Sequence, residues 1–163
     1  MPTEPRPTET LTRLRRWLLW IFLGGSLGTT AELFLLDHTE GFWQWTPIVL
    51  LGAAVLATLW TQIAGSIWSQ RVVSGVLVVV TLSGLVGTFQ HYRGNLEFEL
   101  EIFPSLAGWE LFWRTLKGAT PTLAPGAMIL LGLLGLLAQS RRLGWGKAEG
   151  TRNKAGAGTK EGE

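Results

Sequence analysis

Cysteine is absent from this 163-residue chain. Its absence excludes disulfides, thiolate metal ligands, iron–sulfur clusters and cysteine nucleophiles. Charge is also scarce, since 16% of residues are charged and 47% are hydrophobic, which is unusual for a soluble domain. No phosphate-binding glycine loop, Gly-x-Ser-x-Gly elbow or zincin motif is present. The composition therefore indicates a membrane protein, and the lack of catalytic motifs favours a non-catalytic role over an enzyme.

The chain does contain four long apolar stretches. They cover residues 17–36, 47–64, 72–89 and 122–139. Each approaches the ~20 residues that cross a hydrocarbon core of about 30 Å. Pro47 is expected in the first turn of its helix, where no N–H is needed, and Pro125–Gly126 is expected to bend or delay the fourth helix. The sequence thus predicts an all-α membrane protein, with a four-helix membrane domain over residues 17–140.

Small residues recur at four-residue or similar spacing within these stretches. The pairs are Gly24/Gly28, Ala53/Ala57, Gly84/Gly87 and Gly132/Gly135. Small side chains let helix backbones approach closely in membranes. We expect these pairs to mark helix-packing surfaces.

The two polar ends, residues 1–16 and 141–163, lack the apolar residues needed to fold and are predicted to be mobile. Eleven of the 14 Lys and Arg residues lie in these ends or at Arg71. The positive-inside rule therefore places both termini in the cytoplasm of a bacterial inner-membrane protein, with residues 37–46 and 90–121 outside. Positive charge sorted in this way argues against a nucleic-acid partner. A cleaved signal peptide ending near Ala31 is the alternative to the first span.

The outer segment between the third and fourth spans is too long for a simple turn. Residues 96–102 alternate apolar and acidic side chains, which fits either a short strand or, slightly preferred, a helix capped by Asn95. Residues 105–117 form an amphipathic pattern that Ser105 can cap and Gly118 can terminate. We expect this second helix to lie on the outer interface, or alternatively to cover the outer mouth of the bundle.

The candidate site combines the only two histidines with nearby carboxylates. His38 and His91 each follow an apolar span, and both lie on the predicted outer side. Glu32 is an ionisable residue inside the first span, where it costs free energy unless it faces the bundle, water or a partner. The full candidate set is Glu32, His38, Glu40, His91, Glu97 and Glu99, with Arg93 and Glu101 in supporting positions.

Three interpretations of this set remain open. His and carboxylate ligands without cysteine suit a divalent transition metal, although no recognised metal-binding spacing occurs. Two histidines on facing helices could instead hold haem, but the acidic neighbours would repel its propionates. The third interpretation is a hydrogen-bonded and salt-bridged outer cap that binds no cofactor, with Arg93 pairing Glu97 or Glu32.

Three segments carry a resemblance to a known group. They are Ala31 to Glu40 with Gln44 and Pro47, Gly94 to Glu99, and Leu123 to Gly126 with the Leu/Gly-rich run that follows. Over about residues 17–140 the chain resembles small uncharacterised bacterial four-span integral membrane proteins. The resemblance implies the four-span fold and no activity, because none is known for the group.

Two functional hypotheses follow. The first is an accessory or assembly subunit whose outer face contacts a membrane-protein partner or a second copy of the chain. The second is an ion-binding, metal-binding or proton-handling membrane protein that uses the His/Glu set.

Overall fold

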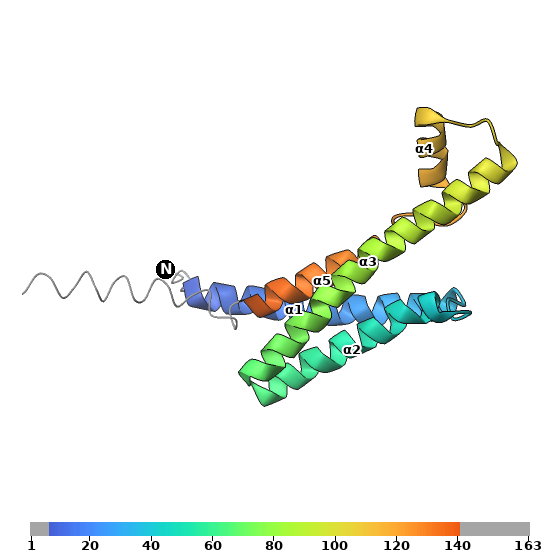
Figure 1. Ribbon diagram of the computed structural model, residues 1–163. Helices are drawn as coiled ribbons and strands as arrows, with labels where there is room; N and C mark the ends of the chain where they lie inside the picture. The colour runs from blue at the N-terminus through green and yellow to red at the C-terminus, as the bar shows by residue number, and fades with distance from the viewer. Residues whose placement is uncertain (1–6, 141–163) are drawn as a thin grey trace, which may run out of the picture.

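The computed structural model describes residues 7–140 and contains five helices in that range. They are α1 (Pro7–Leu35), α2 (Phe42–Ala64), α3 (Ile67–Ile102), α4 (Gly108–Lys117) and α5 (Gly126–Gln139). In Figure 1, α1, α2, α3 and α5 form an elongated bundle, and α4 lies beside the far end of α3. The predicted all-α class is confirmed.

Three of the helices are long and apolar enough to cross a membrane. These are α2, α3 and the part of α1 from Glu9 to Leu35. The fourth apolar helix, α5, has 14 residues, and at 1.5 Å per residue it is only about 21 Å long. It begins after Pro125, so the expected delay at Pro125–Gly126 is confirmed and the helix is shorter than the predicted span of residues 122–139.

The first helix begins earlier than the sequence indicated. Residues 7–16 belong to α1, whereas they were assigned to a mobile end. This extension is anchored because Arg15 Nε donates a hydrogen bond to the Ala138 carbonyl at the end of α5, 2.9 Å away. The remaining predicted mobile residues, 1–6 and 141–163, lie outside the described range.

The predicted boundaries of the second and third spans were also too short. Gly41, in an extended conformation, precedes the first turn of α2, so Pro47 lies in its second turn and not in its first. At the other end, Gly65 adopts a left-handed φ of 60° that ends α2. Ser66 then caps α3 by accepting a hydrogen bond from the Ser69 N–H. A glycine C-cap followed directly by a serine N-cap needs no further connecting residues.

The third helix continues well beyond its apolar part. α3 has 36 residues, and the segment containing Asn95 and the glutamates is its last three turns. The preferred helical interpretation of this segment is therefore confirmed and the strand is wrong. Asn95 does not cap a new helix, because it lies inside a continuous one. We define the arm as residues 91–121, which comprise the end of α3, α4 and the flanking connections.

The bundle is held by close contact between α3 and α5. An added Cβ on Gly84 would lie 2.8 Å from the Ile129 nitrogen, and one on Gly132 would lie 2.9 Å from the Leu77 carbonyl oxygen. The core around this contact includes Phe22, Leu51 and Leu77, all fully buried. The prediction of small-residue packing is thus confirmed for these glycines.

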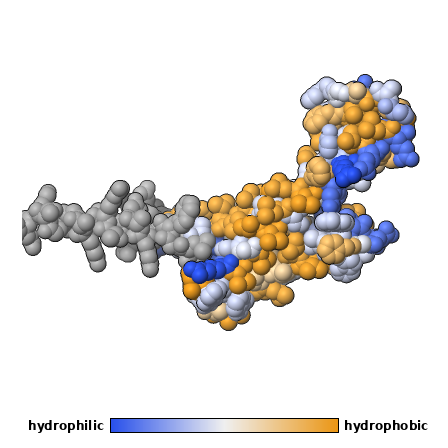
Figure 2. All heavy atoms as spheres, viewed as in Figure 1, coloured by the Kyte–Doolittle hydropathy of each residue, from blue (hydrophilic) through white to orange (hydrophobic). Residues whose placement is uncertain are grey.

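The predicted packing contact at Gly24 and Gly28 is not made within residues 7–140. Gly24 and Gly28 are exposed, and an added Cβ on either would meet nothing within 4 Å. Sequence spacing does not reveal which face of a helix contacts the neighbouring helices. For this reason Gly24 and Gly28 were wrongly expected to pack against another helix of the chain. Figure 2 shows in orange that much of the visible exterior of the bundle is apolar.

Helix order sets which ends lie together. α1 packs against α2 and α5, and α3 packs against α2, α4 and α5. Figure 1 shows that the chain reverses direction between α1 and α2 and again between α2 and α3. Consequently the α1–α2 connection, with His38, lies toward the same end of the bundle as the C-terminal part of α3, with His91.

Candidate functional site

The eight candidate residues do not form one cluster. Glu32 is exposed on α1, and within residues 7–140 its carboxylate makes no hydrogen bond or ion pair. Glu40 is exposed in the α1–α2 connection, where its backbone N–H donates to Gln44 Oε1 at 2.6 Å. Arg93 pairs with Glu97, Nε to Oε1 at 2.8 Å, on the exposed surface of α3. The predicted Arg93–Glu97 pair is therefore confirmed, and Arg93 is not paired with Glu32.

The helical geometry of α3 separates its three glutamates. Glu97 and Glu101 are four residues apart and share an exposed face, whereas Glu99 is half-buried on the side that faces α4. In residues 7–140, no group of three or more His, Asp and Glu side chains is arranged to hold a metal ion. The six-residue metal hypothesis therefore has no geometric support in the described part of the chain.

The two histidines are nevertheless near one another. Partial burial, and secondarily the neighbouring imidazole of His91, hold the pKa of His38 below its ordinary value of 6.5. His91 Nδ1 lies 3.0 Å from the Pro121 carbonyl oxygen, to which its N–H can donate. His91 thus links α3 to the segment that leads into α5.

Acidification is expected to destabilise the fold through His38. Because its pKa is lowered in the folded state, the unfolded chain binds a proton more readily below about pH 6.5. The associated stability is fully present above pH 6.5 and is lost as the pH falls toward the folded-state pKa. Thermal unfolding in detergent between pH 7.5 and 5 measures this, and His38→Gln should flatten the pH dependence. Identical slopes in the variant and the wild type would contradict the assignment.

Asn95 is the polar centre of the arm. Its side chain is 2% exposed. The amide Nδ2 lies 3.1 Å from the Thr115 carbonyl oxygen, 2.7 Å from the Thr120 carbonyl oxygen and 3.0 Å from Thr122 Oγ1. Its Oδ1 accepts from the Thr120 N–H at 3.0 Å and from Thr120 Oγ1 at 2.7 Å. One side chain on α3 therefore holds both the end of α4 and the connection to α5.

Gly118 makes this arrangement sterically feasible. It ends α4, as the sequence predicted, and a Cβ added there would lie 2.7 Å from Asn95 Nδ2. Any larger residue would push against the amide that the connection depends on. The arm thus combines a hydrogen-bonded asparagine with a residue that leaves room for it.

The fourth helix presents an exposed aromatic face. It begins at Gly108, with Ala107 as its cap, and not at the predicted Ser105. Trp109 stacks on both Phe112 and Trp113, with ring centroids 5.2 Å and 6.0 Å apart, and Phe112 also approaches Tyr92 of α3 at 6.1 Å. Trp109 is 74% exposed and Trp113 is 45% exposed. The predicted separation of aromatic and charged sides on this helix is confirmed.

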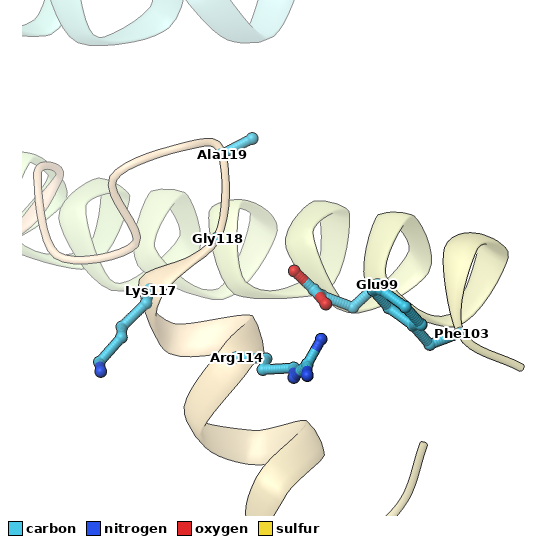
Figure 3. A pocket seen from close by; sticks show the side chains of 6 residues that line it. All are labelled: Glu99, Phe103, Arg114, Lys117, Gly118 and Ala119. Carbon is cyan, nitrogen blue, oxygen red and sulfur yellow. The ribbon is translucent and has the colours of Figure 1, made fainter. Parts of the chain in front are cut away.

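Two adjoining cavities lie where α4 meets α3 and the connection to α5. The first has a volume of about 410 Å³ and is lined by Glu99, Phe103, Arg114, Lys117, Gly118 and Ala119. Figure 3 shows the Glu99 carboxylate and the Arg114 guanidinium pointing into the same space, with Lys117 directed elsewhere. The second cavity, about 460 Å³, shares three of these residues and is otherwise lined by Leu116, Pro121, Thr122, Leu123 and Ala124.

Among the residues that line these cavities, Glu99 was a predicted site residue, but the sequence did not predict the residues that surround it. Asn95, Glu99 and Phe103 follow one another at four-residue spacing, which places them on the same ridge of a continuous helix. That spacing was visible, but the helix was expected to stop before residue 90. Arg114 and Lys117 lie in the predicted amphipathic segment of residues 105–117, but no partner surface for them was predicted.

Comparisons of the chain with protein-family models, with curated proteins and with solved structures find no match. Function is therefore inferred from the residues of the arm and the bundle alone.

Proposed function

We propose that this protein is a non-catalytic accessory or assembly subunit of a bacterial inner membrane, and that its arm contacts a membrane-protein partner on the outer side. The bundle spans the bilayer with four helices, both termini are cytoplasmic, and α4 lies at the outer interface. In the sequence, eleven of the 14 Lys and Arg residues lie before the first apolar stretch, at Arg71 or after the fourth apolar stretch, and this distribution supports the orientation. The short helix α5 crosses the bilayer together with the connection that precedes it.

The observation that carries this proposal is the exposed aromatic face on a fixed support. Trp109, Phe112 and Trp113 form a stacked surface, and the Asn95 hydrogen bonds hold α4 against α3. Tryptophan is enriched among the residues that dominate binding energy at protein interfaces. A preorganised aromatic surface also loses little conformational entropy on binding. These properties suit a docking element better than a catalytic one.

The position of α4 also supports an interfacial location. In Figure 1, α4 lies across the long direction of the bundle, near the level where α1 ends and α2 begins. An amphipathic helix with tryptophans on one side and Arg114 and Lys117 on another is typical of a membrane surface. The same helix can therefore meet lipid on part of its surface and a protein partner on the rest.

Photocrosslinking in the native membrane tests partner binding. A photoreactive phenylalanine analogue at Trp113 is expected to form a discrete adduct with one protein, whereas the same analogue at exposed Val79 of the bundle is expected to react only with lipid. Trp109→Ala should weaken the adduct about thirtyfold, the equivalent of about 2 kcal/mol for a central aromatic contact. Lipid adducts alone at both positions would overturn the proposal.

A further inference from the structure

The first cavity in the arm presents opposite charges that do not pair with each other. Glu99 makes no side-chain hydrogen bond or ion pair with the rest of residues 7–140. Within residues 7–140, Arg114 forms an ion pair only with Glu110, at 3.1 Å, and packs over the Phe103 ring at 4.8 Å. The Arg114 and Glu110 side chains are 43% and 65% exposed. An exposed i, i+4 ion pair contributes about 0.3–0.5 kcal/mol to stability. An anion that binds Arg114 more strongly can therefore replace Glu110 as its partner.

A ligand with one cationic and one anionic group could pair with both charged side chains of the cavity, Glu99 and Arg114. A primary ammonium can donate to the Glu99 carboxylate and lie near the Phe103 ring, where the aromatic face attracts a cation. A phosphate can accept two parallel hydrogen bonds from the Arg114 guanidinium, a geometry that arginine favours. The cavity, with a volume of about 410 Å³, is shallow and mostly open to its surroundings.

The lining of the second cavity indicates which chemical group is attached to the charged part of this ligand. It adjoins the first through Lys117, Gly118 and Ala119, and its remaining lining is mostly apolar, including Leu116 and Leu123. Leu123 is 69% exposed without a ligand. The second cavity leads toward the start of α5, and hence toward the apolar bundle. A polar site continuous with an apolar groove fits a lipid better than a soluble metabolite.

We propose that the arm binds phosphatidylethanolamine, with the headgroup between Glu99 and Arg114 and the glycerol and acyl chains along Leu116 and Leu123. This inference rests on the proposed interfacial position of α4, and it adds a specific lipid to the proposed function. Phosphatidylcholine binds less well, because its quaternary ammonium cannot donate a hydrogen bond to Glu99. Phosphatidylglycerol has no cation for Glu99.

Native mass spectrometry of the full-length protein tests the headgroup preference. The protein is mixed with phosphatidylethanolamine, phosphatidylcholine or phosphatidylglycerol of identical acyl chains, and the retained lipid is counted. Wild type is expected to retain phosphatidylethanolamine about tenfold better than either of the others. Glu99→Gln and Arg114→Gln should each remove this preference. Glu101→Gln, the same change two residues away on the exposed face, should leave it intact.

Two results would overturn the proposal. One is equal retention of the three lipids by the wild type, and the other is the same preference in the Glu99→Gln and Glu101→Gln variants. Soluble phosphoethanolamine serves as a separate arm of the experiment. Failure of millimolar phosphoethanolamine to displace the lipid supports a contribution from the apolar groove, and complete displacement overturns the assignment of the second cavity to the acyl chains.

A spectroscopic measurement separates this inference from the proposed function. Because the chain has no cysteine, an Ala107→Cys variant can be labelled with a fluorophore at the start of α4 alone. Quenching by lipid-attached quenchers in vesicles reports the interfacial position whatever the headgroup. Quenching without headgroup preference overturns only the lipid site, whereas no quenching overturns both the lipid site and the interfacial position of α4.

Discussion

Replacing Gly132 with alanine is expected to destabilise the bundle by about 2 kcal/mol, because overpacking a close contact typically costs 1–3 kcal/mol. The new methyl would lie 2.9 Å from the Leu77 carbonyl oxygen and 3.0 Å from the Thr81 nitrogen. Backbone atoms cannot rotate away as a side chain can, so α3 and α5 must separate. Gly84→Ala should act similarly, since its methyl meets the backbone at Ile129 and Pro125.

Gly75→Ala is the matched control for this prediction. Gly75 lies on α3, is exposed, and has nothing within 4 Å of an added Cβ. Alanine favours a helix more than glycine does, so this variant should be neutral or slightly stabilised. Thermal unfolding of the three purified variants in one detergent measures the difference. A Gly132→Ala variant as stable as Gly75→Ala would show that α3 and α5 do not pack as described.

Asn95→Asp is expected to release the arm while leaving the bundle folded. The substitution replaces the amide donor by an oxygen that faces the Thr115 and Thr120 carbonyl oxygens, 3.1 Å and 2.7 Å from the present Nδ2. Buried groups that lose their partners cost about 1–3 kcal/mol each. Local opening should therefore increase at least about tenfold, since 1.4 kcal/mol corresponds to that factor.

Trypsin provides the measurement, because Arg114 and Lys117 lie within α4. Cleavage at these two residues should accelerate in Asn95→Asp, while cleavage at Arg71 in the bundle stays unchanged. Gly94→Asp adds the same charge one residue away, at an exposed position with open space around it. Equal cleavage rates at α4 in the two variants would mean that Asn95 does not hold the arm.

The bundle was largely predictable because its signals are local. An apolar stretch long enough to span a bilayer is visible within a single segment of the sequence, and such stretches predicted the helices of the bundle. The helix ends were underestimated for a related reason. Apolar content identifies the part of a helix that suits a membrane, whereas backbone hydrogen bonds extend α3 through its polar last turns.

The arm was less predictable because its contacts join residues distant in the sequence. Asn95 bonds to groups 20 to 27 positions later, and no local pattern reveals that pairing. The reverse error occurred for Glu32, His38 and the glutamates of α3. Charge distribution placed them at a common end of the bundle, but within residues 7–140 no three of these side chains are arranged to hold a metal ion.

The uninterrupted course of α3 makes it a mechanical lever. Its 36 residues extend about 54 Å at 1.5 Å per residue, and no proline interrupts them between Ile67 and Ile102. A tilt of 5° about its N-terminal end would move the C-terminal end by about 5 Å. Because Asn95 ties α4 to this helix, the aromatic face must travel with it.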